Sequence, residues 1–269
     1  RGMMELLTYF GSPEEVYFAR SEEYAHAYAG DIGPLLDKDL SPAREIISKC
    51  ADAEARILTI GDGAYPARLK NIYDPPIVLY VKGKLPYIDE EIAVSIVGTR
   101  SCTPYGVKIS ERMGYEITRT GGLVVTGLAK GIDTAAARGA LRAGGSVIGV
   151  LGCGIDVVYP YSNSRLYSDV SEVGALISEY PPGTKPSAAN FPARNRIMSG
   201  LSLGVLVVEA PEHSGALITA SKALEQGRDV YAVPGNIDAD ACKGSNALIM
   251  EGAQPAISGS AITEAYALM

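Results

Sequence analysis

The 269-residue sequence has few residues of the kinds that bind metals or form disulfide bonds. Its four cysteines, Cys50, Cys102, Cys153 and Cys242, lie far apart without CxxC spacing, and it has only two histidines. This scarcity argues against a structural zinc site and against a disulfide framework. We therefore expect no metal, reduced thiols and a cytoplasmic location.

Long apolar runs are also absent. No stretch approaches the roughly 18–20 residues that a membrane-spanning helix needs, and no secretory signal opens the sequence, so we expect no membrane partner. Hydrophobic residues nevertheless make up 47% of the chain and charged residues 20%. A chain of this composition can bury a sizeable core, which excludes wholesale disorder.

The chain lacks an overall positive charge. Its 24 lysines and arginines stand against 31 acidic residues, a net charge of −7, which argues against a protein that coats nucleic acid. The charge is unevenly distributed, with 10 basic and 16 acidic residues in 1–92, 11 and 7 in 93–200, and 3 and 8 in 201–269. Only the middle segment is basic, so an acidic ligand is expected there.

Apolar spacing divides the chain into two predicted domains, residues 1–55 and 56–269. The first has apolar residues at helical spacing between turns rich in glycine and proline, and it predicts a small helical domain without a catalytic constellation. In the second, short apolar β-branched runs alternate with helical stretches, which is typical of an α/β fold with a doubly wound, mostly parallel sheet.

The predicted elements can be stated by residue number. The expected strands are 92–97, 123–126, 147–151, 205–208 and 230–233, with 56–60 and 77–81 at one edge of the sheet. The expected helices are about 105–120, 132–143, 163–173, 193–202 and 216–227.

Glycine-rich loops follow the carboxyl ends of several of these strands, where parallel sheets bind ligands. Glycine lets a ligand approach the backbone closely, and free N–H groups at helix starts bind anions. We therefore predict a phosphate-binding site formed by Gly98, Thr99, Arg100, Ser101, Gly127, Lys130, Gly131, Ser214 and Gly215. Alternatively, the glycines make tight turns, and Asp133 and Ser214 cap helices without any ligand.

The motif FPARNRI carries two arginines in the expected first turn of a helix, where the helix dipole disfavours positive charge unless anions or carboxylates compensate. We predict that its phenylalanine stacks on a nucleobase while its guanidinium groups hold phosphates. The predicted contacts are Phe191, Arg194, Asn195 and Arg196. Alternatively, the arginines pair inside the protein with Glu179 or Glu209.

One glycine pair resembles the start of a dinucleotide-binding fingerprint. Gly152 and Gly154 follow a predicted strand, but Val157 stands at the third glycine position, and no acidic residue is clearly placed to hold a ribose. We therefore expect no nicotinamide cofactor, and no cofactor of any other kind.

Several longer motifs resemble the DNA-processing protein A family (DprA, also called Smf). They are IVGTRSCTPYG, GLAKGIDTAAARGAL, FPARNRIMSGLS, VVEAPEHSGALITASKALEQGRDVYAVPG and GSNALIMEGA, in the order found in that family, and the resemblance spans about residues 57–257. It implies an extended Rossmann-like domain that binds single-stranded DNA and acts as a homodimer. It also implies loading of the RecA recombinase onto incoming DNA during natural transformation, without catalysis.

The resemblance assigns roles by motif position. Arg100, the backbone around Gly127 and Gly131, and both arginines of the FPARNRI motif would hold phosphates, and Phe191 would stack on a base. Where the family often has a histidine the sequence has Ala137, and where it often has a lysine before the FP pair the sequence has Ala188. Lys185 is close enough in sequence to supply that charge. Some members carry a C-terminal winged helix, and no segment here is predicted to form one.

Two further hypotheses concern other properties. A related group of Rossmann-like enzymes, the phosphoribohydrolases, uses the same sheet edge on nucleoside monophosphates and needs a catalytic carboxylate. The sequence lacks their PGGxGT signature, although Glu209 and Glu225 are nearby, so a nucleotide-processing enzyme is the alternative function. Separately, we predict that Leu248 and Ile249, on a short helix, help to form the homodimer, the alternative being that they belong to the monomer core.

Overall fold

The computed structural model describes residues 2–268, and a single sheet forms its centre. Within these residues nine strands lie in the order β1-β2-β6-β5-β4-β3-β7-β8-β9. The strands are β1 (Ala55–Thr59), β2 (Val78–Gly83), β3 (Ile92–Val97), β4 (Gly122–Thr126), β5 (Val147–Leu151), β6 (Ala175–Ser178), β7 (Gly204–Val207), β8 (Asp229–Ala232) and β9 (Gln254–Pro255). Strands β3 to β9 pair in parallel, whereas β2 pairs antiparallel with both β1 and β6.

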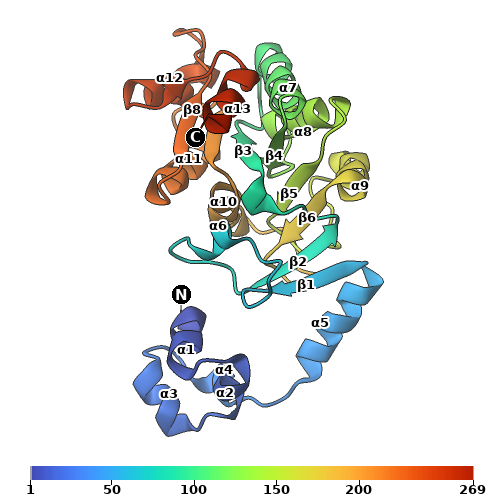
Figure 1. Ribbon diagram of the computed structural model, residues 1–269, viewed down its shortest axis with the longest axis vertical. Helices are drawn as coiled ribbons and strands as arrows, with labels where there is room; N and C mark the ends of the chain where they lie inside the picture. The colour runs from blue at the N-terminus through green and yellow to red at the C-terminus, as the bar shows by residue number, and fades with distance from the viewer. Residues whose placement is uncertain (1, 269) are drawn as a thin grey trace.

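Helices cover both faces of this sheet (Figure 1). Those of the sheet domain are α6 (Ala67–Lys70), α7 (Pro104–Arg119), α8 (Ile132–Arg142), α9 (Ser164–Val173), α10 (Asn190–Leu201), α11 (Gly215–Glu225), α12 (Lys243–Met250) and α13 (Gly259–Ala267). Alternate residues of a strand face opposite layers: Ile96 packs in the cluster that contains residues of α7, α8 and α9, and Val97 in the cluster that contains residues of α10 and α11.

Helix α7 shows how the local sequence sets these elements. Thr103 caps its N-terminus by accepting a hydrogen bond from the Gly106 amide, and a proline occupies its first position. Ile109, Met113 and Ile117 recur every four residues and are all buried against the sheet. The apolar stripe fixes the face that packs, and the cap fixes where the helix begins.

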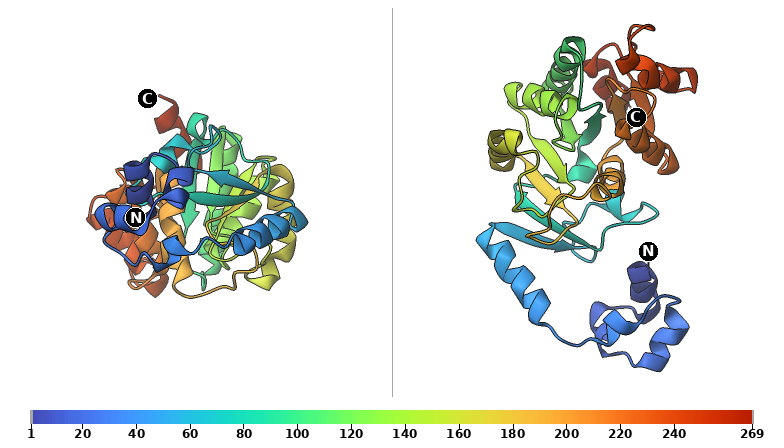
Figure 2. Two further views of the ribbon diagram at one scale, coloured as in Figure 1. Left: turned by 90° about the horizontal axis from the view of Figure 1, so that it is seen from below. Right: turned by 180° about the vertical axis from the view of Figure 1, so that it is seen from behind.

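The N-terminal segment is helical, as expected. Its helices are α1 (Gly2–Phe10), α2 (Pro13–Phe18), α3 (Ser21–Ala27), α4 (Gly33–Leu36) and α5 (Ser41–Asp52). Helices α1 to α4 gather beyond the β1 edge of the sheet, and α5 leads from them to β1 (Figures 1 and 2). Cys50, near the end of α5, is buried in the sheet's core, so this helix is attached to the sheet domain.

The predicted fold class is confirmed: a mostly parallel, doubly wound sheet with β1 and β2 at one edge and helices before it. Two strands, β6 and β9, were not predicted from the sequence. Each is short, at four and two residues, and β6 follows α9 after a single glycine, Gly174, so neither produces a long apolar run. Helix α10 begins at Asn190, earlier than the predicted residue 193. No helix within residues 2–268 is long and apolar enough to cross a membrane.

Candidate nucleic-acid interface

The order in which the chain adds strands to the sheet reverses after β3, so β3 is a topological switch point. Strands β4, β5 and β6 lie on one side of β3, and β7, β8 and β9 on the other. The crevice outside the carboxyl ends of the strands at such a point is where open α/β sheets bind ligands. A groove of about 610 Å³ occupies this position, and it is lined by the loop after β3, the loop before α11 and the first turns of α8, α10 and α11.

Eight of the fourteen predicted DNA-contacting residues line this groove. They are Gly98, Thr99, Arg100, Phe191, Arg194, Asn195, Ser214 and Gly215. The other six do not line it: Ser101, Gly127, Lys130, Gly131, Lys185 and Arg196. Lys130 and Lys185 are exposed, and each is next in sequence to a residue that lines the groove, Ala129 or Pro186.

The loop after β3 is held in place by Glu209. The Glu209 carboxylate is buried and accepts hydrogen bonds from the Thr103 amide at 2.9 Å and the Thr103 hydroxyl at 2.5 Å, while its carbonyl accepts one from the Thr99 amide at 2.8 Å. A Cβ atom at Gly106 would lie 2.2 Å from a carboxylate oxygen, so glycine is needed there. Glu209 thereby fixes the loop that carries Arg100.

Gly131 supports the same loop from the start of α8. Its φ of +80° lies in the region that favours glycine, and a Cβ atom there would lie 2.5 Å from the Thr99 carbonyl oxygen. The Ile132 amide beside it donates a hydrogen bond to that carbonyl at 3.3 Å. Gly131 therefore serves close packing against the loop, and it does not line the groove.

Arg100 is exposed at the groove, and its guanidinium carbon lies 5.0 Å from the centre of the Phe191 ring. This distance is typical of a cation–π contact. The Phe191 ring also lies 5.4 Å from the ring of Tyr159. The arginine beside Phe191 therefore comes from the loop after β3 and not from the FPARNRI motif.

Arg194, by contrast, is buried beneath the groove, with only 4% of its surface exposed. Its guanidinium donates hydrogen bonds to the Gly127 carbonyl at 3.1 Å and to the Val150 carbonyl, which lie at the ends of β4 and β5. A Cβ atom at Gly127 would lie 2.3 Å from this guanidinium, which accounts for the glycine. Arg194 therefore joins two strand ends.

Asp133 completes this buried arrangement. Its carboxylate accepts hydrogen bonds from the Gly127 amide at 3.1 Å and the Ala129 amide at 3.4 Å. Burial raises the pKa of Asp133, and the charge of Arg194 and these amides act in the opposite direction. Both backbone groups of Gly127 are thus already bonded within the protein.

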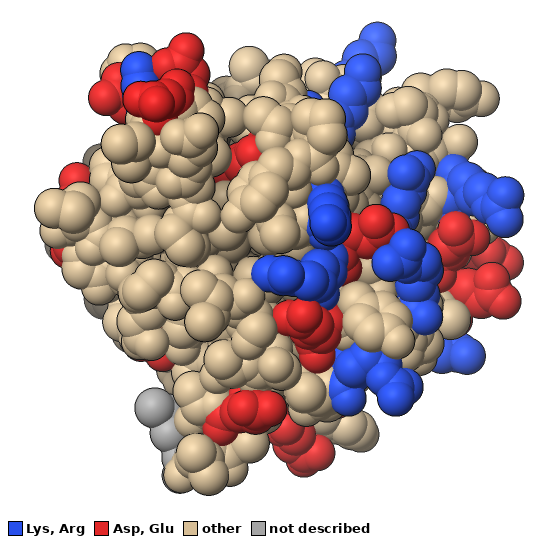
Figure 3. Space-filling model, turned by 90° about the horizontal axis from the view of Figure 1, so that it is seen from above, with Lys and Arg blue, Asp and Glu red and all other residues tan. Residues whose placement is uncertain are grey.

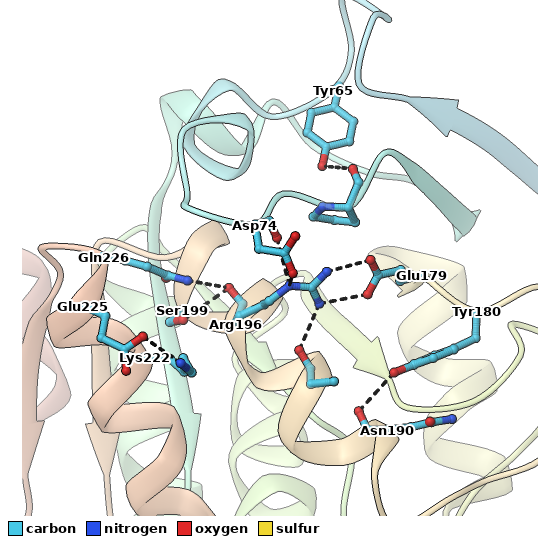
Figure 4. A network of polar contacts seen from close by, with 12 residues as sticks. Tyr65, Asp74, Glu179, Tyr180, Asn190, Arg196, Ser199, Lys222, Glu225 and Gln226 are labelled. Carbon is cyan, nitrogen blue, oxygen red and sulfur yellow. Dashed lines mark hydrogen bonds and ion pairs between the residues drawn. The ribbon is translucent and has the colours of Figure 1, made fainter. Parts of the chain in front are cut away.

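Arg196 points away from the groove, into the network drawn in Figure 4. Its guanidinium donates to both oxygens of Glu179, at 2.8 and 2.6 Å, and lies 3.4 Å from a carboxylate oxygen of Asp74. Burial alone would lower the pKa of Arg196, but the bonds and charge of Glu179 more than offset this and raise it. The pairing with Glu179, weighed as the alternative for this arginine, is the one present.

Two other predicted features have clear positions. Ser214 caps α11 by accepting a hydrogen bond from the Ala216 amide at 3.3 Å, so the positive end of this helix faces the groove. Ala188 lines the groove, and Ala137 is fully buried within α8. The position at which the resemblance leads us to expect a lysine therefore lies in the groove.

The charge of the middle segment is divided between this groove and the helices beside it. Figure 3 shows basic side chains gathered on one side of the molecule, interspersed with acidic ones. Several basic side chains of the middle segment are paired, and Arg142 of α8, for example, lies 2.7 Å from Glu111 of α7. The basic excess in the sequence is thus only partly a property of the groove.

The two carboxylates considered for the nucleotide-processing alternative, Glu209 and Glu225, lie outside the groove. Both oxygens of Glu209 are bonded to Thr103, and the Glu225 carboxylate pairs with Lys222 at 2.6 Å on the surface. Neither lines the groove. Among residues 2–268, no group of three His, Cys, Asp or Glu side chains could hold a metal ion.

Comparison with known proteins gives the family. The model of the DNA recombination-mediator protein A family matches residues 56–267. The chain belongs to this family. It is 44% identical over 207 residues to the DNA processing protein DprA of Bacillus subtilis strain 168, covering 77% of this chain and 70% of that protein. It is 45% identical over 203 residues to DprA of Streptococcus pneumoniae strain R6, covering 75% and 71%.

Solved structures of the family have a similar fold. The X-ray structure of DprA from Streptococcus pneumoniae matches with a TM-score of 0.87 and 35% identity, over 98% of this chain and 92% of that one. DprA from Helicobacter pylori, whose structure is described as giving insight into its single-stranded DNA binding mode, matches with a TM-score of 0.71 and 27% identity, over 80% and 97%. The resemblance stated from the motifs is confirmed.

Tyr159 and His213 also line the groove, although neither was assigned a role from the sequence. His213 lies in a loop that was predicted to reach this edge. Tyr159 belongs to the long segment after β5, and its signal was weaker: an aromatic residue in a loop that leaves the carboxyl end of a parallel strand.

Proposed function

We propose that this chain binds single-stranded DNA in the groove at the carboxyl ends of its parallel strands. The observation that carries this proposal is the exposed Arg100 guanidinium over the Phe191 ring, in a groove that the start of α11 also faces. An aromatic ring offers a surface for any base, and a guanidinium and helix N-termini attract phosphates. The Helicobacter pylori relative, described as binding single-stranded DNA, supports the same conclusion.

Each predicted contact has a different part in this proposal. Arg100 meets phosphate directly, Phe191 stacks on a base, and Lys130 and Lys185 attract the backbone from outside the groove. The start of α11 offers backbone amides. Arg194 acts from beneath the groove, by holding the ends of β4 and β5 at the right separation. Arg196 is held away from the groove by its ion pairs with Glu179 and Asp74.

The wider role follows from the family. We infer a recombination mediator that protects incoming DNA and helps to load RecA onto it in the cytoplasm during natural transformation, without catalysing a reaction. Neither Glu209 nor Glu225, the carboxylates on which the nucleotide-processing alternative depends, lines the groove.

A titration with labelled oligonucleotides tests the DNA-binding proposal. Single-stranded and double-stranded oligonucleotides of equal length are compared at two salt concentrations, with Arg100→Ala beside the wild type. Arg119→Ala, an exposed arginine at the opposite end of α7, is the charge-matched control. We expect preferential binding of the single strand. Arg100→Ala should reduce the steepness of log K against log salt by about 0.7, the value for one phosphate on a single strand.

Two results would overturn the proposal. One is equal affinity of Arg100→Ala and wild type, together with an unchanged salt slope. The other is release of free base on incubation with nucleoside monophosphates, which would favour the nucleotide-processing enzyme.

We also propose a homodimer formed through α12. Leu248 packs partly against the core, Ile249 is half-buried, and Met250 beside them is largely exposed, so the helix presents an apolar end to the surface. Sedimentation of Ile249→Arg should give a monomer where the wild type gives a dimer. A dimer that persists in this variant would contradict the assignment.

A further inference from the structure

Tyr159 is an aromatic residue of the groove to which neither the motifs nor the family match gives a part. It lines the groove together with Phe191, and its ring centre lies 5.4 Å from that of Phe191, with 36° between the two planes. Despite this contact, 39% of its surface remains exposed. A tyrosine that served only to support Phe191 would need no such exposure inside a groove.

A hydrogen bond from the protein core fixes the backbone at Tyr159. Its carbonyl accepts a hydrogen bond at 2.7 Å from the hydroxyl of Tyr167, a residue of α9 that is buried in the core. The backbone of this segment is therefore set before any ligand arrives. An aromatic side chain on such a backbone loses little conformational freedom on binding.

Phe191, in comparison, is half-buried. Its ring packs so closely on Gly152 that a Cβ atom there would lie 2.8 Å from Cδ1, and Arg100 lies over the ring. The Tyr159 ring is the neighbouring aromatic surface, and it lines the same groove. The groove therefore contains two neighbouring aromatic rings, and an aromatic ring can stack on any base.

We propose that Tyr159 is a second base-stacking residue, so that the groove seats two neighbouring bases of a single strand, one at Phe191 and one at Tyr159. This inference rests on the proposed function and deepens it. It assigns affinity to a neutral residue, which contributes through the bases and not through the phosphates. Its energetic signature therefore differs from that of Arg100.

Replacement of the ring tests this difference. Tyr159→Ala should weaken binding of oligothymidylate by roughly tenfold, the scale of one base–aromatic stack. Its salt slope should equal that of the wild type, whereas the slope of Arg100→Ala is less steep by about 0.7. Tyr159→Phe keeps the ring and should bind as the wild type does.

Tyr161→Ala is the matched control. This tyrosine lies two residues further along the chain, at the start of a short 3-10 helix, is 82% exposed and is not among the described residues that line the groove. Its removal should leave the affinity unchanged.

A fluorescent reporter follows the stack directly, because the chain contains no tryptophan. In Tyr159→Trp the single indole should be quenched by oligothymidylate, with the same midpoint as the anisotropy of the labelled strand. Tyr161→Trp should show little quenching at that midpoint.

The outcomes separate this inference from the function on which it rests. If the wild type and Arg100→Ala behave as proposed but Tyr159→Ala binds as tightly as the wild type, the stacking role of Tyr159 alone is wrong. The same conclusion follows if the oligonucleotide binds to Tyr159→Trp without quenching the fluorescence of its indole. If the wild type does not bind single strands, the proposed function is wrong and the inference is overturned with it.

Discussion

The loop after β3 and helix α10 both carry arginines near the same end of the sheet, but these arginines have different surroundings. Arg100 of the loop is exposed and lies over an aromatic ring. Arg194 of α10 is buried against backbone carbonyls, and Arg196 is paired with Glu179. The two regions show that an arginine near a ligand edge can serve the ligand or the scaffold, and that burial and partners decide between them.

Helical geometry explains the division within α10. Residues two apart in a helix point in directions about 200° apart, since each residue advances about 100°. Arg194 therefore faces the strand ends while Arg196 faces Asp74 and Glu179 on the other side (Figure 4). The two side chains cannot line one groove together. The predictions below test this division, from the largest expected effect to the smallest.

Removal of the buried charge should have the largest effect. Arg194→Met leaves Asp133 buried without its counter-charge, and we expect the free energy of unfolding to fall by about 3–5 kcal/mol. Urea denaturation measures this loss. Adding Asp133→Asn should restore part of it, because the amide carries no charge and still accepts the backbone hydrogen bonds. A stable Arg194→Met protein that no longer binds DNA would instead place this arginine at the DNA.

The same variant should respond to pH in a defined direction. The folded-state pKa of Asp133 is raised, so folding favours its protonated form, and the group's contribution to stability falls as pH rises from about 4 through the raised pKa. Without Arg194 the shift is larger. Urea denaturation at pH 5 and pH 7 should therefore show a smaller loss at pH 5, and a larger loss at pH 5 would contradict this.

Removal of the ion pair between Arg196 and Glu179 should destabilise the protein less than removal of Arg194. Arg196→Met eliminates the bonds to Glu179, whose side chain is partly exposed, and we expect a destabilisation of about 1–3 kcal/mol. The salt slope of DNA binding should be unchanged, because this arginine faces away from the groove. A slope less steep by about 0.7 would show instead that Arg196 contacts a phosphate.

Arg100→Lys keeps the charge and removes the planar group over Phe191. We expect a loss of binding free energy of about 1 kcal/mol, with an unchanged salt slope and a stability within about 0.5 kcal/mol of the wild type. Anisotropy titration and thermal unfolding measure the two quantities. A destabilised Arg100→Lys would mean that this loop, like α10, uses its arginine for the scaffold.

The flanking lysines should matter least. Lys185→Ala and Lys130→Ala remove charges outside the groove, so each should lower affinity by less than Arg100→Ala does, and the loss should shrink at higher salt. Titration at two salt concentrations measures both. An effect of Lys185→Ala as large as that of Arg100→Ala would show instead that Lys185 contacts the DNA directly.

Seven of the nine strands were predicted from the sequence because most of them are short, largely apolar runs that alternate with amphipathic helices, a strong periodic signal. Arg100 and Phe191 were placed at one edge because loops after parallel strands converge there. Arg194 could not be distinguished from Arg100, because burial depends on which carbonyls the fold brings within reach. Gly127 was predicted to make a tight turn or to meet a ligand, whereas its close contact is with the Arg194 side chain, which is remote in sequence.

Hydrogen–deuterium exchange with and without a saturating single-stranded oligonucleotide tests the central claim most directly, since it reports where the strand lies on the folded chain. Binding in the groove predicts added protection in peptides that cover residues 98–103, 187–192 and 211–216, with no change around Asp74 and Glu179. Protection confined to the outer surface of α7, α8 and α9, with exchange in the groove loops unchanged, would contradict it.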